Sequence, residues 1–348
     1  MDNNEFWKEG LREDVRIFEE AGIGGLKLRN RLLRSATCEG LAGPDGSLNE
    51  ELYGIYDALA EGGAGALITG FTGINDSDDA LEGMMRLSAD GLIPQYKELV
   101  DRVHERGCLI FSQLALGNYY IEGKPVEIDD LPAEGIEEIR QLFADAAERA
   151  EEAGFDGIQL HMAHHFFLSR SFSPLYNHRE DDYGGTSVKR ARLLAEVLDA
   201  VRERVPDMAV ICKIDFTDDM EGGLTMSDAL TVSMLLSDHG VDAIEVSAVG
   251  SARKGIRIPY DEGYFKENAL AVKSVTKVPV ILVGGNRTID SMEDMLKNED
   301  TDFFSLSRPL IREPDLPKKW EEDRSYAARC ISCNTCFTTS GHRCVFRD

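Results

Sequence analysis

Two histidines three positions apart, His161 and His164, follow a short apolar run and could act on one substrate atom. Neutral imidazoles donate N–H hydrogen bonds, and two donors on one carbonyl oxygen stabilise the negative charge that develops there. Alternate strand residues point to opposite faces, so the pair requires the strand to end near His161 and the chain to turn back. The alternatives are buried histidines without a catalytic role and, with His165 as a third nitrogen, a metal site.

A second group of reactive side chains lies in the segment 330–348, which holds four of the seven cysteines: Cys330, Cys333, Cys336 and Cys344. In a reducing cytoplasm such a cluster indicates a metal before a disulfide. Thiolates at this spacing suit a 4Fe-4S cluster, and a zinc site with four cysteine ligands or four free thiols are the alternatives.

These side chains need elements to position them. Short apolar runs typical of strands alternate eight times with longer amphipathic segments typical of helices. The eight runs are 31–38, 66–73, 109–114, 157–161, 209–216, 243–249, 279–285 and 303–307. Helical patterns cover 137–153, 187–203 and 226–239, with Gly154 and Gly240 in stop positions. Strand–helix alternation predicts a parallel sheet.

The ends of the runs favour a barrel over a doubly wound sheet. Seven of the eight runs end in polar, small or glycine residues, and in a barrel all these ends meet on one face, where active sites form. A doubly wound sheet would carry GxGxxG after its first strand, whereas Gly22–Gly25 precede it. The prediction is an α/β fold, a (β/α)8 TIM barrel over residues 1–325, followed by a cysteine-rich tail over 326–348.

Composition narrows the partners. A net charge of -25 argues against non-specific binding to nucleic acid or anionic membranes. No apolar stretch is long enough to cross a bilayer, and the polar segment 1–10 does not resemble a signal peptide. We expect a cytoplasmic protein that acts on a small molecule, with its oligomeric state left open.

One long pattern points to a family. The chain reads Phe-Ser-Pro-Leu-Tyr-Asn-His-Arg over 172–179, Asp-Tyr-Gly-Gly over 182–185 and Arg-Ala-Arg over 190–192. This pattern resembles the signature of the Old Yellow Enzyme family of FMN-dependent ene-reductases. The segment 28–31, Gln113-Leu114 and the His161–His164 motif extend the resemblance over nearly the whole chain.

The resemblance implies a set of contacts to the flavin ring: Ala36, Thr37 and Cys38 along it, Gly70 by its backbone, and Gln113 and Lys213 at the pyrimidine half. A cation at position 213 would stabilise the negative charge of reduced flavin. The alternative for Lys213 is an ion pair with a barrel acid such as Asp215 or Glu245, and the alternative for Cys38 is a buried strand thiol.

The resemblance also places the FMN phosphate at the ends of the last two strands. Gly284, Gly285 and Asn286 precede a helix there, and Ser307-Arg308 replace the family's usual Gly-Arg. Backbone amides at a helix start and one guanidinium make a suitable phosphate site.

The chain departs from the family at His165-Phe166, where the family has Gly-Tyr and uses that tyrosine as proton donor. Phenylalanine has no proton to donate. The candidates for the donor are water, Tyr119, Tyr120, Tyr176 and His165. Tyr176 and His178 also replace the usual threonine and arginine, which indicates an altered pocket.

The cysteine tail is similar to the iron–sulfur motif of the dienoyl-CoA reductases and trimethylamine dehydrogenases. The last gap, between Cys336 and Cys344, is shorter than in those relatives, and their FAD and nucleotide domains do not follow in this sequence.

Together the residues and the resemblance predict an FMN-dependent ene-reductase. It would pass hydride from NADH or NADPH through flavin N5 to the β-carbon of a cyclic or aromatic enone, such as a flavone, or of an enoyl thioester. Four aromatic side chains could stack on a ring: Phe166, Phe167, Tyr119 and Tyr120. The alternatives are a flavin and iron–sulfur dehydrogenase that passes electrons to a partner protein, and a flavin-free barrel with a structural zinc tail.

Overall fold

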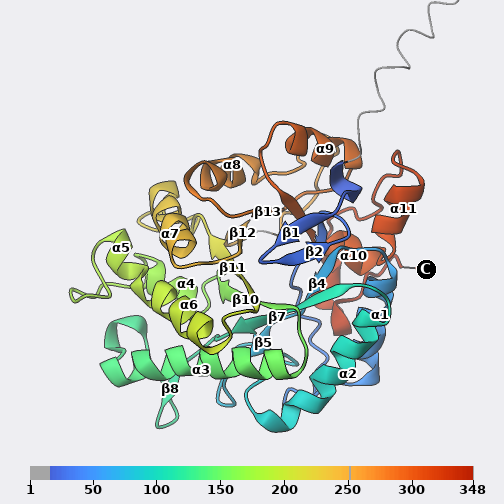
Figure 1. Ribbon diagram of the computed structural model, residues 1–348. Coiled ribbons are helices and arrows are strands. Elements are labelled where there is room, and N and C mark those ends of the chain that lie inside the picture. The colour runs from blue at the N-terminus through green and yellow to red at the C-terminus, as the bar shows by residue number, and fades with distance from the viewer. Residues whose placement is uncertain (1–15, 251, 348) are drawn as a thin grey trace, which may run out of the picture.

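A closed barrel of eight parallel strands forms the centre of the computed structural model, which describes residues 16–250 and 252–347 (Figure 1). The ring consists of β3 (Leu32–Arg34), β4 (Ala66–Ile68), β7 (Leu109–Ala115), β10 (Gly157–Met162), β11 (Ala209–Asp215), β12 (Ala243–Ser247), β13 (Val280–Val283) and β14 (Phe303–Leu306). The strands pair in chain order, and β14 pairs with β3 to close the ring. Each strand lies within, or extends by one residue, a run that the sequence predicts. The predicted (β/α)8 barrel is therefore confirmed.

Helices surround the ring of strands (Figure 1). They are α1 (Glu50–Glu61), α2 (Ile93–His104), α3 (Ala133–Glu152), α4 (Phe167–Phe172), α5 (Ser187–Arg190), α6 (Arg192–Arg204), α7 (Met226–Asp238), α8 (Lys266–Val275), α9 (Ile289–Lys297), α10 (Arg308–Arg312) and α11 (Leu316–Glu322). The helix expected over 187–203 is divided into α5 and α6. Gly154 and Gly240 have φ of 89° and 85°, the left-handed conformation that ends a helix most easily at glycine.

Short additional strands and 3-10 turns complete the fold. The strands are β1 (Ala21–Ile23), β2 (Leu26–Leu28), β5 (Thr72–Gly73), β6 (Met85–Arg86), β8 (Tyr120–Ile121) and β9 (Lys124–Pro125). The turns are η1 (Arg16–Phe18), η2 (Asp90–Leu92), η3 (Ile128–Asp130), η4 (Thr335–Thr338) and η5 (Ser340–His342). The β1–β2 hairpin packs Ile23 and Leu28 against the apolar side chains inside the barrel, including Phe111 and Phe303. Burial of these side chains closes the amino end of the barrel.

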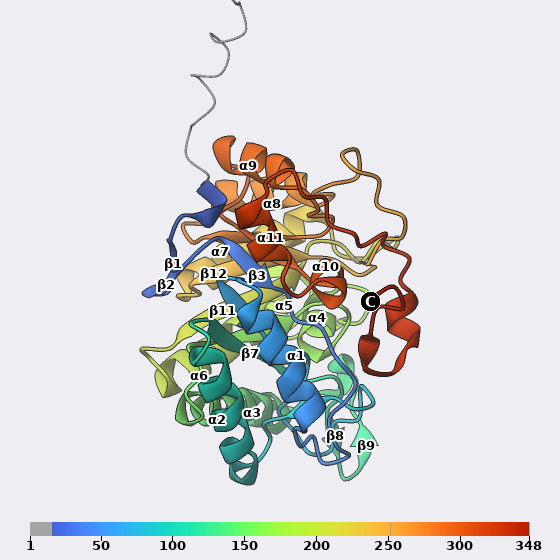
Figure 2. The ribbon, with the colours of Figure 1, turned by 90° about the vertical axis from the view of Figure 1, so that its right-hand side faces the viewer.

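The C-terminal tail lies at the other end of the barrel. Seen from the side, the β1–β2 hairpin and the segment that carries η4 and η5 are at opposite ends of the molecule (Figure 2). The tail is therefore on the side where the strands have their carboxyl ends.

The signature arginine Arg190 joins three segments near α5. Its guanidinium donates to the carbonyl oxygens of Phe172 and Gly185 and forms an ion pair of 2.8 Å with Asp228. Asp228 in turn accepts hydrogen bonds from the backbone and side chain of Thr225 at the start of α7. Arg190 thus holds together the segments on one side of the barrel.

Among the described residues, no helix has both the length and the apolar character of a membrane-spanning segment. The polar N-terminal segment 1–10, read from the sequence as unlike a signal peptide, lies outside the described residues.

Replacing Arg190 with alanine tests this arrangement. The variant leaves the Asp228 carboxylate and two carbonyl oxygens without their donor, so we expect the free energy of unfolding to fall by about 3 kcal/mol. Urea denaturation followed by circular dichroism measures the loss. Arg192→Ala, which removes an exposed arginine paired with Glu196 on the same helix, serves as control and is expected to cost under about 1 kcal/mol.

Candidate active site

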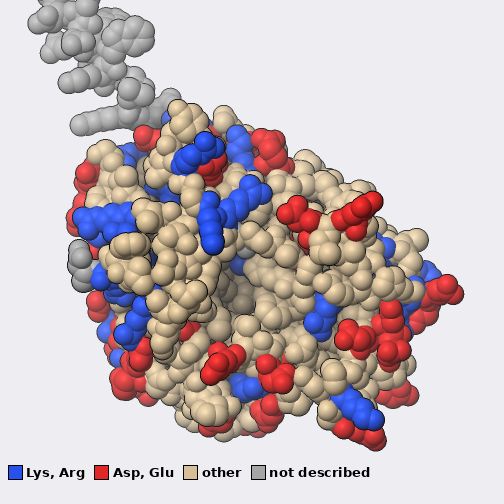
Figure 3. All heavy atoms as spheres, turned by 180° about the vertical axis from the view of Figure 1, so that it is seen from behind, with Lys and Arg blue, Asp and Glu red and all other residues tan. Residues whose placement is uncertain are grey.

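A cavity of about 270 Å³ lies among the carboxyl ends of the strands. The molecular face opposite the view of Figure 1 is hollowed near its centre (Figure 3). Eight of the residues expected in the site line this cavity: Ala36, Thr37, Cys38, His164, Lys213, Gly284, Ser307 and Arg308. The barrel therefore brings together segments that are far apart in the sequence.

Five other expected residues do not line the cavity: Gly70, Gln113, His161, Gly285 and Asn286. Gln113 and His161 are buried on β7 and β10, each 3% exposed. A Cβ on Gly70 would lie 2.6 Å from the carbonyl oxygen of Thr37 and 3.1 Å from Cα of Cys38. Gly70 thus gives the Thr37–Cys38 segment room to pack. Its approach to the flavin ring by the backbone stays a prediction.

Gly285 and Asn286 shape the turn after β13. Gly285 has a φ of 81°, and a Cβ there would lie 2.8 Å from the carbonyl oxygen of Asp261. The side-chain amide of Asn286 donates to the carbonyl oxygens of Leu282 and Ser305, at 2.9 and 3.2 Å. These contacts join the ends of β13 and β14 and hold Gly284 at the cavity.

The histidine pair has the bend that its spacing requires. His161 lies on β10, which ends at Met162, and His164 has a φ of 63° in the turn that follows. The backbone N–H of His164 donates to the Asp215 carboxylate at 2.5 Å, which stabilises this uncommon conformation. The two rings are 5.2 Å apart and nearly perpendicular. His164 Nε2 is 2.8 Å from the Ser247 hydroxyl, whereas the buried His161 Nδ1 has no hydrogen-bond partner among the described residues.

Both imidazoles are neutral at physiological pH. Burial lowers the pKa of His161 well below its usual value, and the neighbouring His164 and Lys213 lower it further. Burial and Lys213 lower the pKa of His164 to about 3. The pair can therefore act as neutral hydrogen-bond donors, which is electrostatic catalysis and not acid catalysis.

His165 belongs to a different group of side chains. Its φ is 58°, its Nε2 is 2.9 Å from the Asp218 carboxylate, and its Nδ1 is 3.2 Å from the Tyr176 hydroxyl. No three His, Cys, Asp or Glu side chains in the described ranges 16–250 and 252–347 are arranged to hold a metal ion. The alternative of a three-histidine metal site therefore has no support.

The aromatic residues divide into two groups. Phe166 lies next to the histidine pair, with its ring 4.8 Å from Phe71 and 5.1 Å from His161. Phe167 and Tyr119 are buried in the core, where their rings lie 5.9 Å apart. The expectation that these last two could stack on a substrate is wrong, because other core side chains already cover them.

Two proton-donor candidates already donate elsewhere. The Tyr119 hydroxyl donates to Glu138 and the Tyr120 hydroxyl donates to Asp79, both at 2.6 Å. Burial raises the pKa of Tyr119, and the hydrogen bond to Asp79 raises that of Tyr120. Tyr176 and His165 stay candidates beside water.

Lys213 both lines the cavity and forms an ion pair with a barrel acid, the two alternatives that the sequence left open. It lines the cavity, and its Nζ lies 3.4 Å from the Glu245 carboxylate and 3.2 Å from the Ser35 hydroxyl. The ion pair with Glu245 is therefore confirmed, and the one with Asp215 is not formed. Ser35 is not among the residues that the sequence predicts for the site. Its position next to the expected Ala36 could have indicated it.

Two buried arginines also line the cavity. Arg287 and Arg308 line it with Ser305, Ser307 and Gly284. Arg308 donates to the carbonyl oxygen of Arg253 and the side chain of Asn334, and Arg287 donates to the Ser332 hydroxyl. Burial lowers the pKa of Arg287, and the nearby Arg308 lowers it further. Arg287 was missed, although it directly follows the expected Gly284–Asn286 turn.

These side chains suit a phosphate. Among the described residues, Arg287 Nε and Ser305 Oγ are buried without a hydrogen-bond partner. Buried cations and unsatisfied donors favour a bound anion with several acceptor oxygens. With Lys213 also in the cavity lining, the residues fit FMN.

Cys38 lines the cavity as a thiol. Burial raises its pKa to about 11, so the sulfur carries a proton at neutral pH. The C-terminal tail packs against it, because His342 Nδ1 is hydrogen-bonded to the Cys38 carbonyl oxygen, and Phe337 and His342 line the cavity. The tail therefore forms part of the cavity wall.

The four tail cysteines surround one small space. Cys330, Cys333, Cys336 and Cys344 line a cavity of about 20 Å³, and all four are free. Burial raises the pKa of Cys336, and nearby Cys330 raises it further. The described side chains are not placed as a set of metal ligands. Iron–sulfur, zinc and free thiols stay as alternatives.

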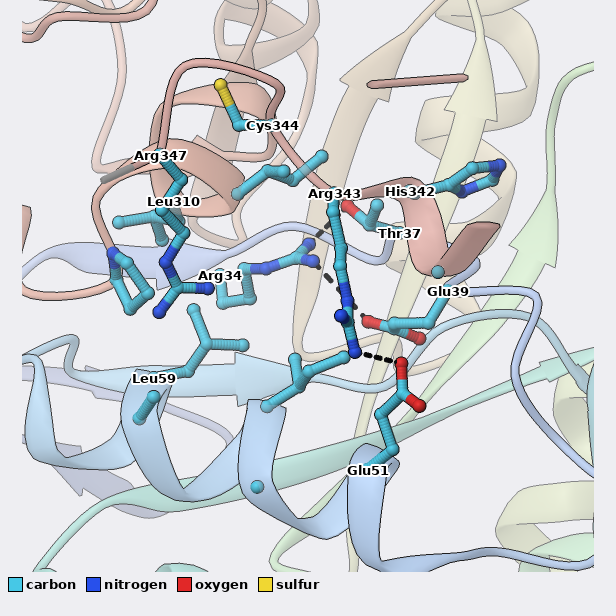
Figure 4. A pocket seen from close by; sticks show the side chains of 16 residues that line it. Arg34, Thr37, Glu39, Glu51, Leu59, Leu310, His342, Arg343, Cys344 and Arg347 are labelled. Carbon is cyan, nitrogen blue, oxygen red and sulfur yellow. Dashed lines mark hydrogen bonds and ion pairs between the residues drawn. The ribbon is translucent and has the colours of Figure 1, made fainter. Parts of the chain in front are cut away.

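A separate cavity of about 430 Å³ lies between α1, α10 and the tail (Figure 4). The buried Arg34 guanidinium forms hydrogen bonds with Thr37 and lies 3.5 Å from the Glu39 carboxylate. Burial raises the pKa of Glu39 to about 7. Thr37 lines both cavities, so this group supports the segment at the mouth of the barrel.

Comparison with known proteins gives the family. The model of the NADH:flavin oxidoreductase / NADH oxidase family matches residues 16–130 and 121–326. The chain is 32% identical over 346 residues to an NADH oxidase of Thermoanaerobacter brockii, covering 91% of this chain and 52% of that protein. It is 30% identical over 321 residues to an NADPH dehydrogenase of Listeria welshimeri, covering 87% of this chain and 93% of that protein.

The fold agrees with these matches. An old yellow enzyme homologue from Zymomonas mobilis superposes with a TM-score of 0.73 at 22% identity, covering 88% of this chain and 92% of that chain. The chain spans about half the length of the Thermoanaerobacter enzyme. The expected resemblance is thus confirmed, and the chain belongs to the NADH:flavin oxidoreductase / NADH oxidase family, which includes the Old Yellow Enzymes.

Proposed function

We propose that this chain is an FMN-dependent oxidoreductase that uses NADH or NADPH to reduce the C=C bond of an α,β-unsaturated carbonyl compound. The observation that carries the proposal is the neutral histidine pair at a cavity that is lined by three buried cations. FMN, when bound, supplies hydride transfer between the nicotinamide and the β-carbon of the substrate.

The residues of this chain bind and orient. Arg287 and Arg308 would hold the FMN phosphate, and Lys213 would place a positive charge beside the ring. His161 and His164 would hold the substrate carbonyl oxygen, where negative charge develops as the β-carbon accepts hydride. The unpartnered His161 Nδ1 supports this role, because a buried polar atom without a partner is costly.

The surroundings of the pair favour a cyclic or aromatic enone, such as a flavone, or an enoyl thioester. Phe166 lies beside His161 and offers apolar ring surface to the substrate. The net charge of -25 supports a small-molecule substrate over nucleic acid. Proton delivery to the α-carbon falls to water, Tyr176 or His165.

A second candidate is a flavin dehydrogenase that passes electrons to a partner protein. The observation that favours it is the tail, which gathers four cysteines and also contributes Phe337 and His342 to the cavity wall. A 4Fe-4S cluster in the tail would then lie close to the flavin. The flavin-free barrel is disfavoured, because the two buried arginines suit a phosphate and the family is one of flavin oxidoreductases.

The histidine roles are tested by separating the two half-reactions. For His161→Ala and His164→Ala we expect flavin oxidation by 2-cyclohexenone to slow by about 100-fold or more, with a much smaller change in flavin reduction by NADH. Anaerobic stopped-flow absorbance at the flavin band measures both rates. His239→Ala, which removes a surface histidine paired with Asp199, is the control. Equal losses in both half-reactions would mean that the pair mainly holds the flavin or the fold, and a colourless wild type would contradict the proposal.

The cysteine tail is tested by metal analysis of protein purified without oxygen. If a 4Fe-4S cluster is present, we expect about four iron atoms per chain and their loss when Cys336 is replaced with serine. Zinc at about one atom per chain indicates the structural alternative, and the absence of both metals indicates free thiols. Flavin bands without iron would remove the cluster and leave the ene-reductase proposal standing.

The neutral state of His164 is tested by stability against pH. A histidine in the unfolded chain has a pKa of about 6.5, whereas His164 in the folded protein has a pKa of about 3. Below pH 6.5 the unfolded state therefore binds more protons, and the free energy of unfolding decreases as the pH falls. Between pH 7 and pH 5 we expect His164→Gln to lose about 2 kcal/mol less unfolding free energy than the wild type. Urea denaturation at both pH values measures the difference. Identical pH dependence would show that His164 is not held neutral by the fold.

A further inference from the structure

We propose that Glu245 is a positioning residue of the flavin site, which reduces the electrostatic field of Lys213 in the cavity and sets the hydrogen-bond direction of Gln113. The inference rests on the proposed binding of FMN in the cavity. Glu245 lies on β12, inside the barrel, and is 0% exposed. It does not line the cavity itself, so its effect would pass through its neighbours.

Three donors surround the Glu245 carboxylate. Its Oε1 accepts from the Ser35 hydroxyl at 2.9 Å and lies 3.4 Å from Lys213 Nζ. Its Oε2 accepts from the side-chain amide of Gln159 at 2.6 Å. Both carboxylate oxygens therefore act as hydrogen-bond acceptors.

An acceptor of this kind fixes the direction of the next hydrogen bonds. Gln159 must turn its amide nitrogen toward Glu245, which leaves its carbonyl oxygen to face Gln113. Gln113 then donates its own amide nitrogen to Gln159 Oε1, at 2.8 Å. A neutral amide at position 245 would lose this control, because it can donate as well as accept.

The same carboxylate determines how much positive charge the cavity carries. Lys213 is only 4% exposed, so water screens it weakly and Glu245 is its ion-pair partner. A close ion pair presents a smaller net field to the cavity than a free ammonium group. Glu245 therefore reduces the preference of the site for the negatively charged reduced flavin, and lowers the flavin reduction potential.

The potential of the FMN-loaded, full-length protein tests this effect directly. For Glu245→Gln we expect reduced flavin to gain at least tenfold over oxidised flavin, a rise of about 30 mV for a two-electron couple. We expect Glu245→Asp, which keeps the charge, to lie near the wild type. Anaerobic titration against a redox dye of known potential measures each value.

Two further variants show whether Glu245 acts through Lys213. We expect Lys213→Met to lower the potential, and Glu245→Gln to have a much smaller effect in the Lys213→Met background than alone. Glu293→Gln is the matched control, because Glu293 is also a buried carboxylate, bonded to the backbone N–H of Ile17 away from the cavity. Any of three results would overturn the inference. The potential does not rise in Glu245→Gln, it rises equally with and without Lys213→Met, or it rises as much in Glu293→Gln as in Glu245→Gln.

The hydrogen-bond direction has its own test, which does not require Glu245→Gln to fold. Gln159→Met breaks the connection between Glu245 and Gln113 without a change in charge. We expect its FMN dissociation constant to rise several-fold, measured by flavin fluorescence, with the potential near that of the wild type. Unchanged affinity would overturn this part. A wild type that binds no FMN, or that NADH does not reduce, would instead count against the proposed function.

Discussion

Closure of the parallel sheet is the constraint on which the rest of the molecule depends. The pairing of β14 with β3 completes the ring, and each parallel neighbour then satisfies the backbone groups of the next. Only in a closed ring do Ser35, Lys213 and Glu245, which come from the first, fifth and sixth barrel segments, point into one interior. The β1–β2 hairpin covers the amino end with apolar side chains, so the polar part of the interior lies toward the carboxyl end.

The interior changes from apolar to polar along the barrel axis. Near the hairpin it contains Leu33, Ile211 and Ile281, which exclude water. One layer further on, Gln159 and Glu245 pair with each other and with Gln113 and Lys213. Charged groups can be buried there because each has a partner, and the resulting rigidity keeps the histidine pair and Lys213 in fixed positions.

Much of the fold could be predicted from the sequence, because the spacing of apolar residues and the residue types at turns are local properties of the chain. The eight apolar runs and the glycines at 154 and 240 identify strands and helix ends without any tertiary information. Two kinds of site residue could be predicted: those next to strand ends and those in the family signature. Arg287, Ser35 and the Gln159–Glu245 pair were missed because their importance arises from contacts across the barrel. Tyr119 and Phe167 were misjudged because a sequence does not say which aromatic side chains the core covers.

The position of the tail has a consequence for how the protein binds its cofactor. Phe337 and His342 form part of the wall around the flavin cavity, and His342 is attached to the backbone of Cys38. A cofactor bound in this cavity would therefore touch residues from both ends of the described chain, Cys38 near the start and His342 near the end. Binding of the cofactor and docking of residues 335–342 would then stabilise each other.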